Sequence, residues 1–119
     1  MNPKTVCISG VSKGLGKALS IEFDQRGWQV AGCARTTSAL IKVGSQLSNS
    51  HFFRSVDITN LKQVLTFSEE VIENLGSPTL LVNNAGKINS NARLHEVSED
   101  EFLEVFKVNV CGTHNMIKA

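Results

Sequence analysis

Three glycines lie close together near the start of the chain, in the segment 9–16, Ser-Gly-Val-Ser-Lys-Gly-Leu-Gly. An apolar run at 5–8 predicts a buried strand before them, and residues 17–23 read as the start of a helix. Gly10 permits a tight turn, Gly14 lets a phosphate approach the backbone, and Gly16 lets the helix pack close to the strand. Free N–H groups and the helix dipole meet at such a turn, so the segment predicts an anion site.

The spacing of these glycines separates several kinds of phosphate loop. A P-loop ending on Gly16 and Lys17 would need glycine at Val11 and a hydroxyl at Ala18, so a P-loop is excluded. The pattern Gly-x3-Gly-x-Gly also differs from the common dinucleotide fingerprint GxGxxG. Taken alone, the segment could equally be an ordinary glycine-rich turn.

A basic residue, Arg35, ends the apolar run 28–34, which predicts the second strand. A site that prefers NAD(H) usually has an acidic residue here, about 20 residues after the glycines, to bind the ribose hydroxyls. A guanidinium instead suits a 2′-phosphate, and Lys13 could approach that phosphate from the other side. The pair predicts NADP(H) in preference to NAD(H), although each residue alone could be a solvated surface charge.

Strand and helix patterns alternate along the chain. Strands are predicted at 5–8, 28–34, 51–56 and 79–83, and helices from Lys17 to near Gly27, over about 38–47, from 60 to 76, and from Ser98 to the chain end. Asn60 with Gln63, and Ser98 with Glu101, have the spacing of capping boxes. The alternation predicts an α/β fold, a Rossmann-like doubly wound parallel sheet of about four strands in the order 3-2-1-4. Its strand ends would bring the glycine segment, Arg35, Asp57 and the segment 83–86 to one edge.

The segment 83–86, Asn-Asn-Ala-Gly, together with the glycine spacing, resembles the short-chain dehydrogenase/reductase family. The resemblance covers residues 1–119 but only the cofactor half of the family's domain, and implies an NAD(P)-binding Rossmann domain incomplete at its C-terminus. It implies that Asn83 braces the sheet, that Ala85 and Gly86 lie against the ribose, and that Asp57 and the Ile58 N–H meet the adenine. For Asp57 the alternative is a plain helix N-cap. Segments 2–16 and 82–89 look most similar to plant reductases of the pterin aldehyde type.

The predicted cofactor-binding residues are therefore Gly10, Ser12, Lys13, Gly14, Leu15, Gly16, Arg35, Asp57, Ile58, Asn83, Ala85 and Gly86.

An amide side chain, Asn109, is predicted on the apolar face of the last helix. Phe102, Val105, Phe106 and Met116 share that face by their spacing. A core asparagine bonded to neighbouring backbone would be the ordinary interpretation. The segment 109–112 resembles the family's NxxG segment, which implies that Asn109 is catalytic and positions a water linked to the catalytic lysine. In the family this helix also helps to build a dimer interface, so a homo-oligomer through this helix is expected of the complete protein.

The groups that carry the family's chemistry have no counterpart here. The family uses a Tyr-x-x-x-Lys pair and a serine after this helix, and the chain has no tyrosine. The expected function is an NADP(H)-dependent oxidoreductase that reduces a small carbonyl substrate, as the activity of a longer parent of which these 119 residues are a fragment. The residues alone are expected to be inactive. A non-catalytic dinucleotide-binding or interaction module is the alternative, and a flavodoxin-like domain is a weaker one.

The composition of the chain limits the kinds of partner, location and metal site that we expect. The chain has 119 residues, a net charge of +1 and 41% hydrophobic residues, so we expect one domain and no nucleic-acid binding. No apolar run is long enough to span a bilayer, and the N-terminal residues lead straight into the first strand, so a cytoplasmic location is expected. Cys7, Cys33 and Cys111 are expected to be buried reduced thiols, with no metal site.

Overall fold

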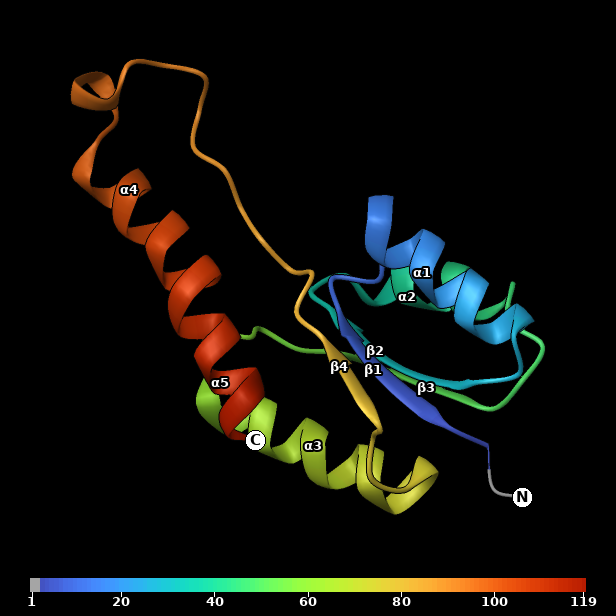
Figure 1. Ribbon diagram of the computed structural model, residues 1–119. Coiled ribbons are helices and arrows are strands. Elements are labelled where there is room, and N and C mark those ends of the chain that lie inside the picture. The colour runs from blue at the N-terminus through green and yellow to red at the C-terminus, as the bar shows by residue number, and fades with distance from the viewer. Residues whose placement is uncertain (1–2) are drawn as a thin grey trace.

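A computed structural model describes residues 3–119; residues 1–2, part of the N-terminal run considered above, lie outside the described residues. Its four strands form one parallel sheet in the order β3-β2-β1-β4, which confirms the predicted order (Figure 1). The strands are β1 (Thr5–Ser9), β2 (Gln29–Ala34), β3 (His51–Ser55) and β4 (Leu80–Val82). In the centre of the sheet Ile8 of β1 pairs with Gly32 of β2 and Val82 of β4. All four strands therefore end at the same edge.

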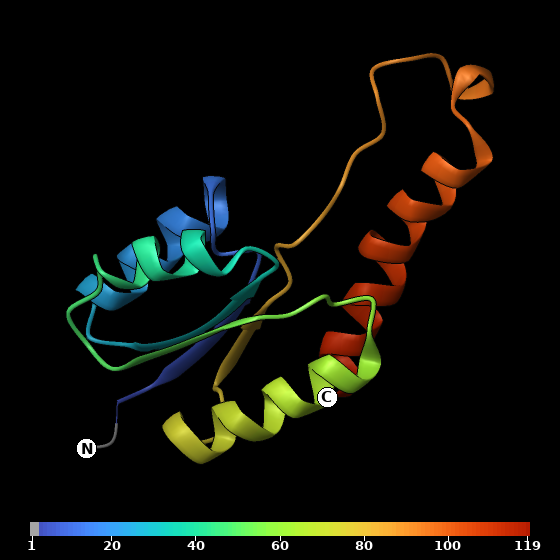
Figure 2. The same ribbon diagram turned by 180° about the vertical axis from the view of Figure 1, so that it is seen from behind.

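Helices cover both faces of the sheet. Helices α1 (Gly14–Gln25) and α2 (Thr37–Gly44) lie on one face, and α3 (Leu61–Leu75) with α5 (Thr113–Lys118) lies on the other (Figures 1 and 2). Successive side chains of a strand point to opposite faces, so β1 contributes Val6 and Ile8 to the first core and Cys7 to the second. The second core also includes Phe67 of α3 and Met116 of α5.

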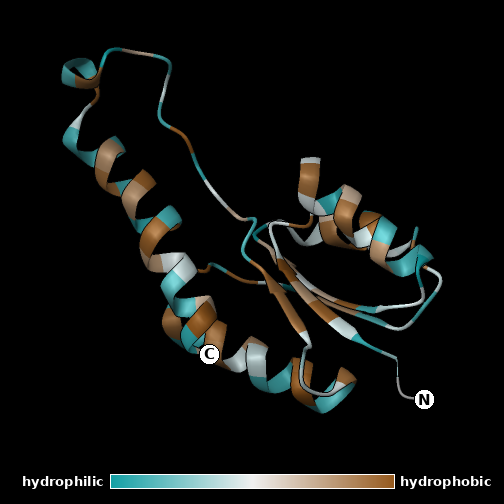
Figure 3. Ribbon diagram, viewed as in Figure 1, coloured by the Kyte–Doolittle hydropathy of each residue, from teal (hydrophilic) through white to brown (hydrophobic). Residues whose placement is uncertain are grey.

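The segment between β4 and α5 projects away from the sheet (Figure 1). After β4 the chain runs through a long loop and the short 3-10 helix η1 (Leu94–Glu96) into α4 (Glu99–Phe106), η2 (Lys107–Gly112) and α5. The last three form one continuous helical rod, in which η2 has π-helical hydrogen bonding (Figure 1). Figure 3 shows hydrophobic residues along this rod. The sequence predicts one uninterrupted α-helix from Ser98 to the chain end, and this prediction is wrong at η2. There each hydrogen bond spans five residues, as in a π-helix, and not four.

Both predicted capping boxes form only in part. The Asn60 side chain accepts from the Gln63 N–H, and the Ser98 side chain accepts from the Glu101 N–H, as expected. The return bonds are absent among residues 3–119, because the Gln63 amide instead accepts from the Asp57 N–H and the Glu101 carboxylate accepts from the N–H of residue 90. Each cap therefore ties its helix to the preceding loop and does not close on itself.

Two of the three cysteines are buried as expected. Burial raises the pKa of Cys7 and of Cys33 to about 12. Cys111 is free but exposed, so the expectation that it is buried is wrong; it lies in η2, where only Gly112 is buried. None of the helices within residues 3–119 is long and apolar enough to cross a membrane.

Candidate functional site

The glycine segment forms the junction between β1 and α1. The Gly10 N–H donates to the Cys33 carbonyl over 2.8 Å, and Gly10 has a φ of +76°. A Cβ on Gly16 would lie 2.0 Å from the Gly10 carbonyl oxygen, so only glycine lets α1 approach β1 this closely. A Cβ on Gly14 would meet nothing within 4 Å. The space beside Gly14 is thus open to a ligand, while the space beside Gly16 is filled by the protein itself.

The first turn of α1 leaves backbone donors free. Helix α1 begins at Gly14, earlier than the start at Lys17 expected from the sequence, and its N-cap, Lys13, makes no side-chain capping bond. The first N–H groups of a helix have no partner inside it, and the helix dipole adds positive charge there. The turn therefore offers N–H donors to an anion, with the exposed side chain of Leu15 beside them.

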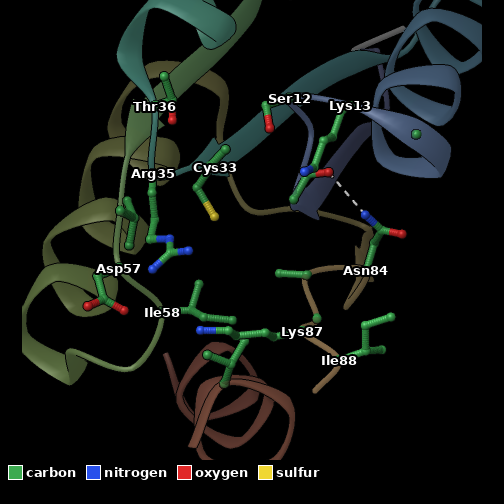
Figure 4. A pocket seen from close by; sticks show the side chains of 17 residues that line it. Ser12, Lys13, Cys33, Arg35, Thr36, Asp57, Ile58, Asn84, Lys87 and Ile88 are labelled. Atoms are coloured by element: carbon green, nitrogen blue, oxygen red, sulfur yellow. Dashed lines mark hydrogen bonds between the residues drawn. The ribbon is translucent and has the colours of Figure 1, made fainter. Parts of the chain in front are cut away.

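A cleft of about 640 Å³ lies along the carboxyl ends of the strands (Figure 4). The size is within the range of small-molecule sites. Nine predicted residues line it: Gly10, Ser12, Lys13, Gly14, Arg35, Asp57, Ile58, Ala85 and Gly86. Leu15, Gly16 and Asn83 do not line it, and Asn83 lies with Asn109 in a neighbouring hollow. The structure thus brings most of the predicted cofactor residues into one space.

Two cations in this cleft are free of carboxylate partners. Within residues 3–119 neither Lys13 nor Arg35 forms an ion pair, and both are exposed. The Arg35 side chain extends into the cleft (Figure 4). Its backbone is fixed from β3, because the Ser55 hydroxyl donates to the Arg35 carbonyl over 2.8 Å. The third cation that lines the cleft, Lys87, lies 3.9 Å from a Glu104 carboxylate oxygen.

The carboxylate of Asp57 is held ionised. Its Oδ1 accepts from the Thr59 hydroxyl over 2.7 Å and from the Thr59 N–H over 3.0 Å. The hydroxyl bond is the main cause that lowers the pKa of Asp57, and the charges of Arg35 and Lys107 add to it. Asn60, and not Asp57, is the N-cap of α3, so the N-cap interpretation of Asp57 is wrong.

The asparagine that braces the sheet is Asn84. Its side-chain amide donates to the Gly10 carbonyl over 3.0 Å, as the dashed line in Figure 4 marks. The buried Ser9 hydroxyl accepts from the N–H groups of Asn84 and Ala85, over 3.1 and 3.0 Å. Asn83 is exposed and makes no side-chain hydrogen bond to residues 3–119, so the bracing role expected for it is corrected to Asn84. One feature of the sequence could have indicated the contact between Ser9 and Asn84: Ser9 ends a buried strand, and a buried hydroxyl needs a hydrogen-bond partner.

The Asn109 side chain forms two hydrogen bonds to the loop that follows β4. Its Oδ1 accepts from the Lys87 N–H and its Nδ2 donates to the Lys87 carbonyl, each over 2.7 Å. The side chain is exposed, so the alternative of a core asparagine is wrong in respect of burial. Phe102 and Phe106, which were expected on the same face, are also about half exposed. Bonding to neighbouring backbone is what we expect of an asparagine without a catalytic role. These two bonds fix the loop directly after Gly86. The water-positioning role stays a prediction.

Comparison with known proteins defines the class. The family model described as short chain dehydrogenase matches residues 4–119, and the chain belongs to that family. This confirms the resemblance drawn from the two motifs.

Individual relatives agree with this class. The chain is 41% identical over 117 residues to an NADPH-dependent pterin aldehyde reductase of Arabidopsis thaliana, covering 97% of this chain and 48% of that protein. It is 30% identical to an L-fucose dehydrogenase of Mus musculus, over 97% of this chain and 42% of that protein. An alcohol dehydrogenase from Thermococcus sibiricus, solved with 5-hydroxy-NADP, superimposes with a TM-score of 0.92 at 31% identity, over 98% of this chain and 51% of that one. The chain spans about half the length of the relatives it matches.

Proposed function

We propose that residues 1–119 form the NADP(H)-binding half of a reductase that acts on an aldehyde or ketone. The observation that carries the proposal is the pair of free cations, Lys13 and Arg35, in one cleft with the open backbone at Gly14. The 41% identity to a reductase named as NADPH-dependent supports it. The bound cofactor would supply or accept the hydride.

Each part of the cleft suits one part of the dinucleotide. The free N–H groups at the start of α1 would hold the pyrophosphate, since Gly14 leaves room for it. Lys13 and Arg35 would hold the 2′-phosphate, because phosphate oxygens bind charged donors strongly. Ala85 and Gly86 would pass along the ribose, and Asp57 with Ile58 would meet the adenine.

Asn109 contributes to the proposed reaction by positioning. Its two bonds to the Lys87 backbone hold the loop that follows Gly86 against the cleft. The chain contains no tyrosine, so the proton donor that the family uses is not among these residues. The carbonyl reduction that we propose therefore needs a proton donor in addition to the groups described here.

Nucleotide affinity tests the proposal. We expect calorimetry to show NADPH bound at least about tenfold more tightly than NADH, and Lys13→Ala or Arg35→Ala to weaken NADPH by roughly tenfold or more while leaving NADH unchanged. The control is Lys62→Ala, because Lys62 is exposed on α3 and does not line the cleft. NADH bound as tightly as NADPH would overturn the assignment of Lys13 and Arg35.

A further inference from the structure

The turn that follows β3 is fixed by several hydrogen bonds. The Asp57 N–H donates to the Gln63 side chain over 2.8 Å, and the Asp57 carbonyl accepts from the Asn60 N–H over 2.9 Å. Thr59 donates twice to one oxygen of the Asp57 carboxylate. These bonds all come from within residues 57–63, so they make a local frame for the turn.

One further bond reaches this turn from the far end of the chain. The Nδ2 of Asn115, on α5, donates to the Ile58 carbonyl over 2.9 Å. Ile58 is 7% exposed, and a Cβ on Gly112 would lie 2.6 Å from the Cδ1 atom of Ile58. The helical rod therefore packs directly against Ile58, and Asn115 holds the backbone at the same residue.

Two hydrogen-bonding groups of the turn are left unused. Among residues 3–119 the Ile58 N–H has no acceptor and the Oδ2 of Asp57 has no donor. Both residues line the cleft. A donor and a charged acceptor on adjacent residues match the edge of adenine, where the 6-amino group donates and the ring nitrogen N1 accepts.

The peptide units on both sides of Ile58 are held through their carbonyls. Because a peptide unit is planar, the bond from Asn60 to the Asp57 carbonyl sets the direction of the Ile58 N–H. The bond from Asn115 sets the next peptide unit, and together they fix both backbone dihedrals of Ile58. Without Asn115 the turn would keep its local frame and the packing of Ile58 against Gly112, but the Ile58 carbonyl would lose its hydrogen bond to the rod.

We propose that Asn115 is a positioning residue for base selection: it orients the Asp57–Ile58 turn so that the cleft prefers adenine over a 6-oxo purine. This inference rests on the proposed function, because it concerns the adenine end of the same cofactor site. The rod would thereby contact two residues that line the cleft, Lys87 through Asn109 and Ile58 through Asn115.

The test compares NADPH with its hypoxanthine analogue, in which the 6-amino group is a carbonyl and N1 carries a proton. That base reverses both hydrogen bonds, so the wild-type protein should prefer NADPH by about tenfold or more. In Asn115→Leu and in the isosteric Asn115→Asp, which lacks the N–H donor, we expect this preference to fall to about threefold or less. His114→Leu is the control, since His114 is exposed on the same helix. Melting curves identify any variant that fails to fold. If one Asn115 variant fails to fold, the base preference is measured in the other.

A purely structural role would weaken both nucleotides equally. Equal losses in the two Asn115 variants would therefore overturn the inference, as would a wild-type protein that does not distinguish the two bases. Failure of the wild-type protein to bind NADPH at all would instead overturn the proposed function, and the inference with it. Loss of preference for NADPH in both variants, with His114→Leu unchanged, supports the inference.

Discussion

The sheet region, residues 3–82, and the C-terminal arm, residues 83–119, are built in different ways. All of the buried hydrophobic residues except Met116 belong to the sheet region. In the arm, Phe102, Leu103 and Phe106 of α4 are each about half exposed, at 52, 51 and 50%. Burial therefore determines the structure of the first region, whereas local signals determine most of the second.

The local signals that favour a helix are present in the sequence of α4. Ser98 caps the helix, and its first turn carries Glu99, Asp100 and Glu101, which favour the positive end of a helix dipole. The arm contacts the rest of the chain at few points, chiefly through Asn84 at Gly10, Asn115 at Ile58 and Met116 in the second core. Its exposed apolar face is where the expected contact with a second copy would form, and that oligomer stays a prediction.

The largest expected difference between the regions is in the cost of removing an aromatic ring. Phe67→Ala should lower the free energy of unfolding by about 3–5 kcal/mol, because Phe67 is 2% exposed and its removal leaves a cavity. Phe102→Ala should change it by no more than about 0.5 kcal/mol. Urea unfolding measures both values. Equal costs would contradict the division into two regions.

The glycine segment allows a similar contrast within the sheet region. Gly16→Ala should destabilise the fold by roughly 3 kcal/mol, since its Cβ would overlap the Gly10 carbonyl oxygen. Gly14→Ala should cost only about 1 kcal/mol, from its φ of +58°, yet it should weaken NADPH binding because the methyl group occupies the open space. Denaturation and calorimetry separate the two effects. A more stable Gly16→Ala protein would show that the close packing is not as described.

The two adjacent asparagines provide a smaller contrast. Asn84→Ala should cost about 1–2 kcal/mol, because it removes the bond that joins β4 to the Gly10 carbonyl. Asn83→Ala should lie within about 0.5 kcal/mol of wild type, because Asn83 is exposed. Thermal melts of the two variants, compared side by side, test the assignment. The reverse order would return the bracing role to Asn83.

Thiol reactivity distinguishes the regions without a mutation. At pH 8 a disulfide reagent should label Cys111 of the arm rapidly, and Cys7 and Cys33 only after unfolding, because burial raises their pKa to about 12. A pKa raised in the folded state means that burial of these thiols contributes stability below the ordinary thiol pKa, about 8.5, and that this contribution is lost as the pH rises from there towards 12. Mass spectrometry of the labelled chain identifies the sites. Fast labelling of Cys33 would contradict its burial beneath the cleft.

The sequence predicted the sheet region well because burial leaves a periodic pattern. The places where apolar runs end predicted the glycine turn and the positions of Arg35 and Asp57. The alternation of these runs with helical segments predicted the strand order. The π turn at η2 was not predicted, since no local residue pattern distinguishes it from an α-helix. The hydrogen bonds of Asn84 and Asn115 reach partners 74 and 57 residues away, which spacing along the chain does not reveal.

The most direct test of the proposed cofactor cleft is an NMR titration of the ¹⁵N-labelled protein with NADPH. The account predicts that the backbone N–H signals of Ser12 to Gly16, Ile58 and Gly86 shift most, because these groups lie where we propose that the pyrophosphate, adenine and ribose bind. Signals of α4, such as that of Phe102, should stay in place. Shifts concentrated in α4 or on the outer face of α3, or no shifts at all, would contradict the account.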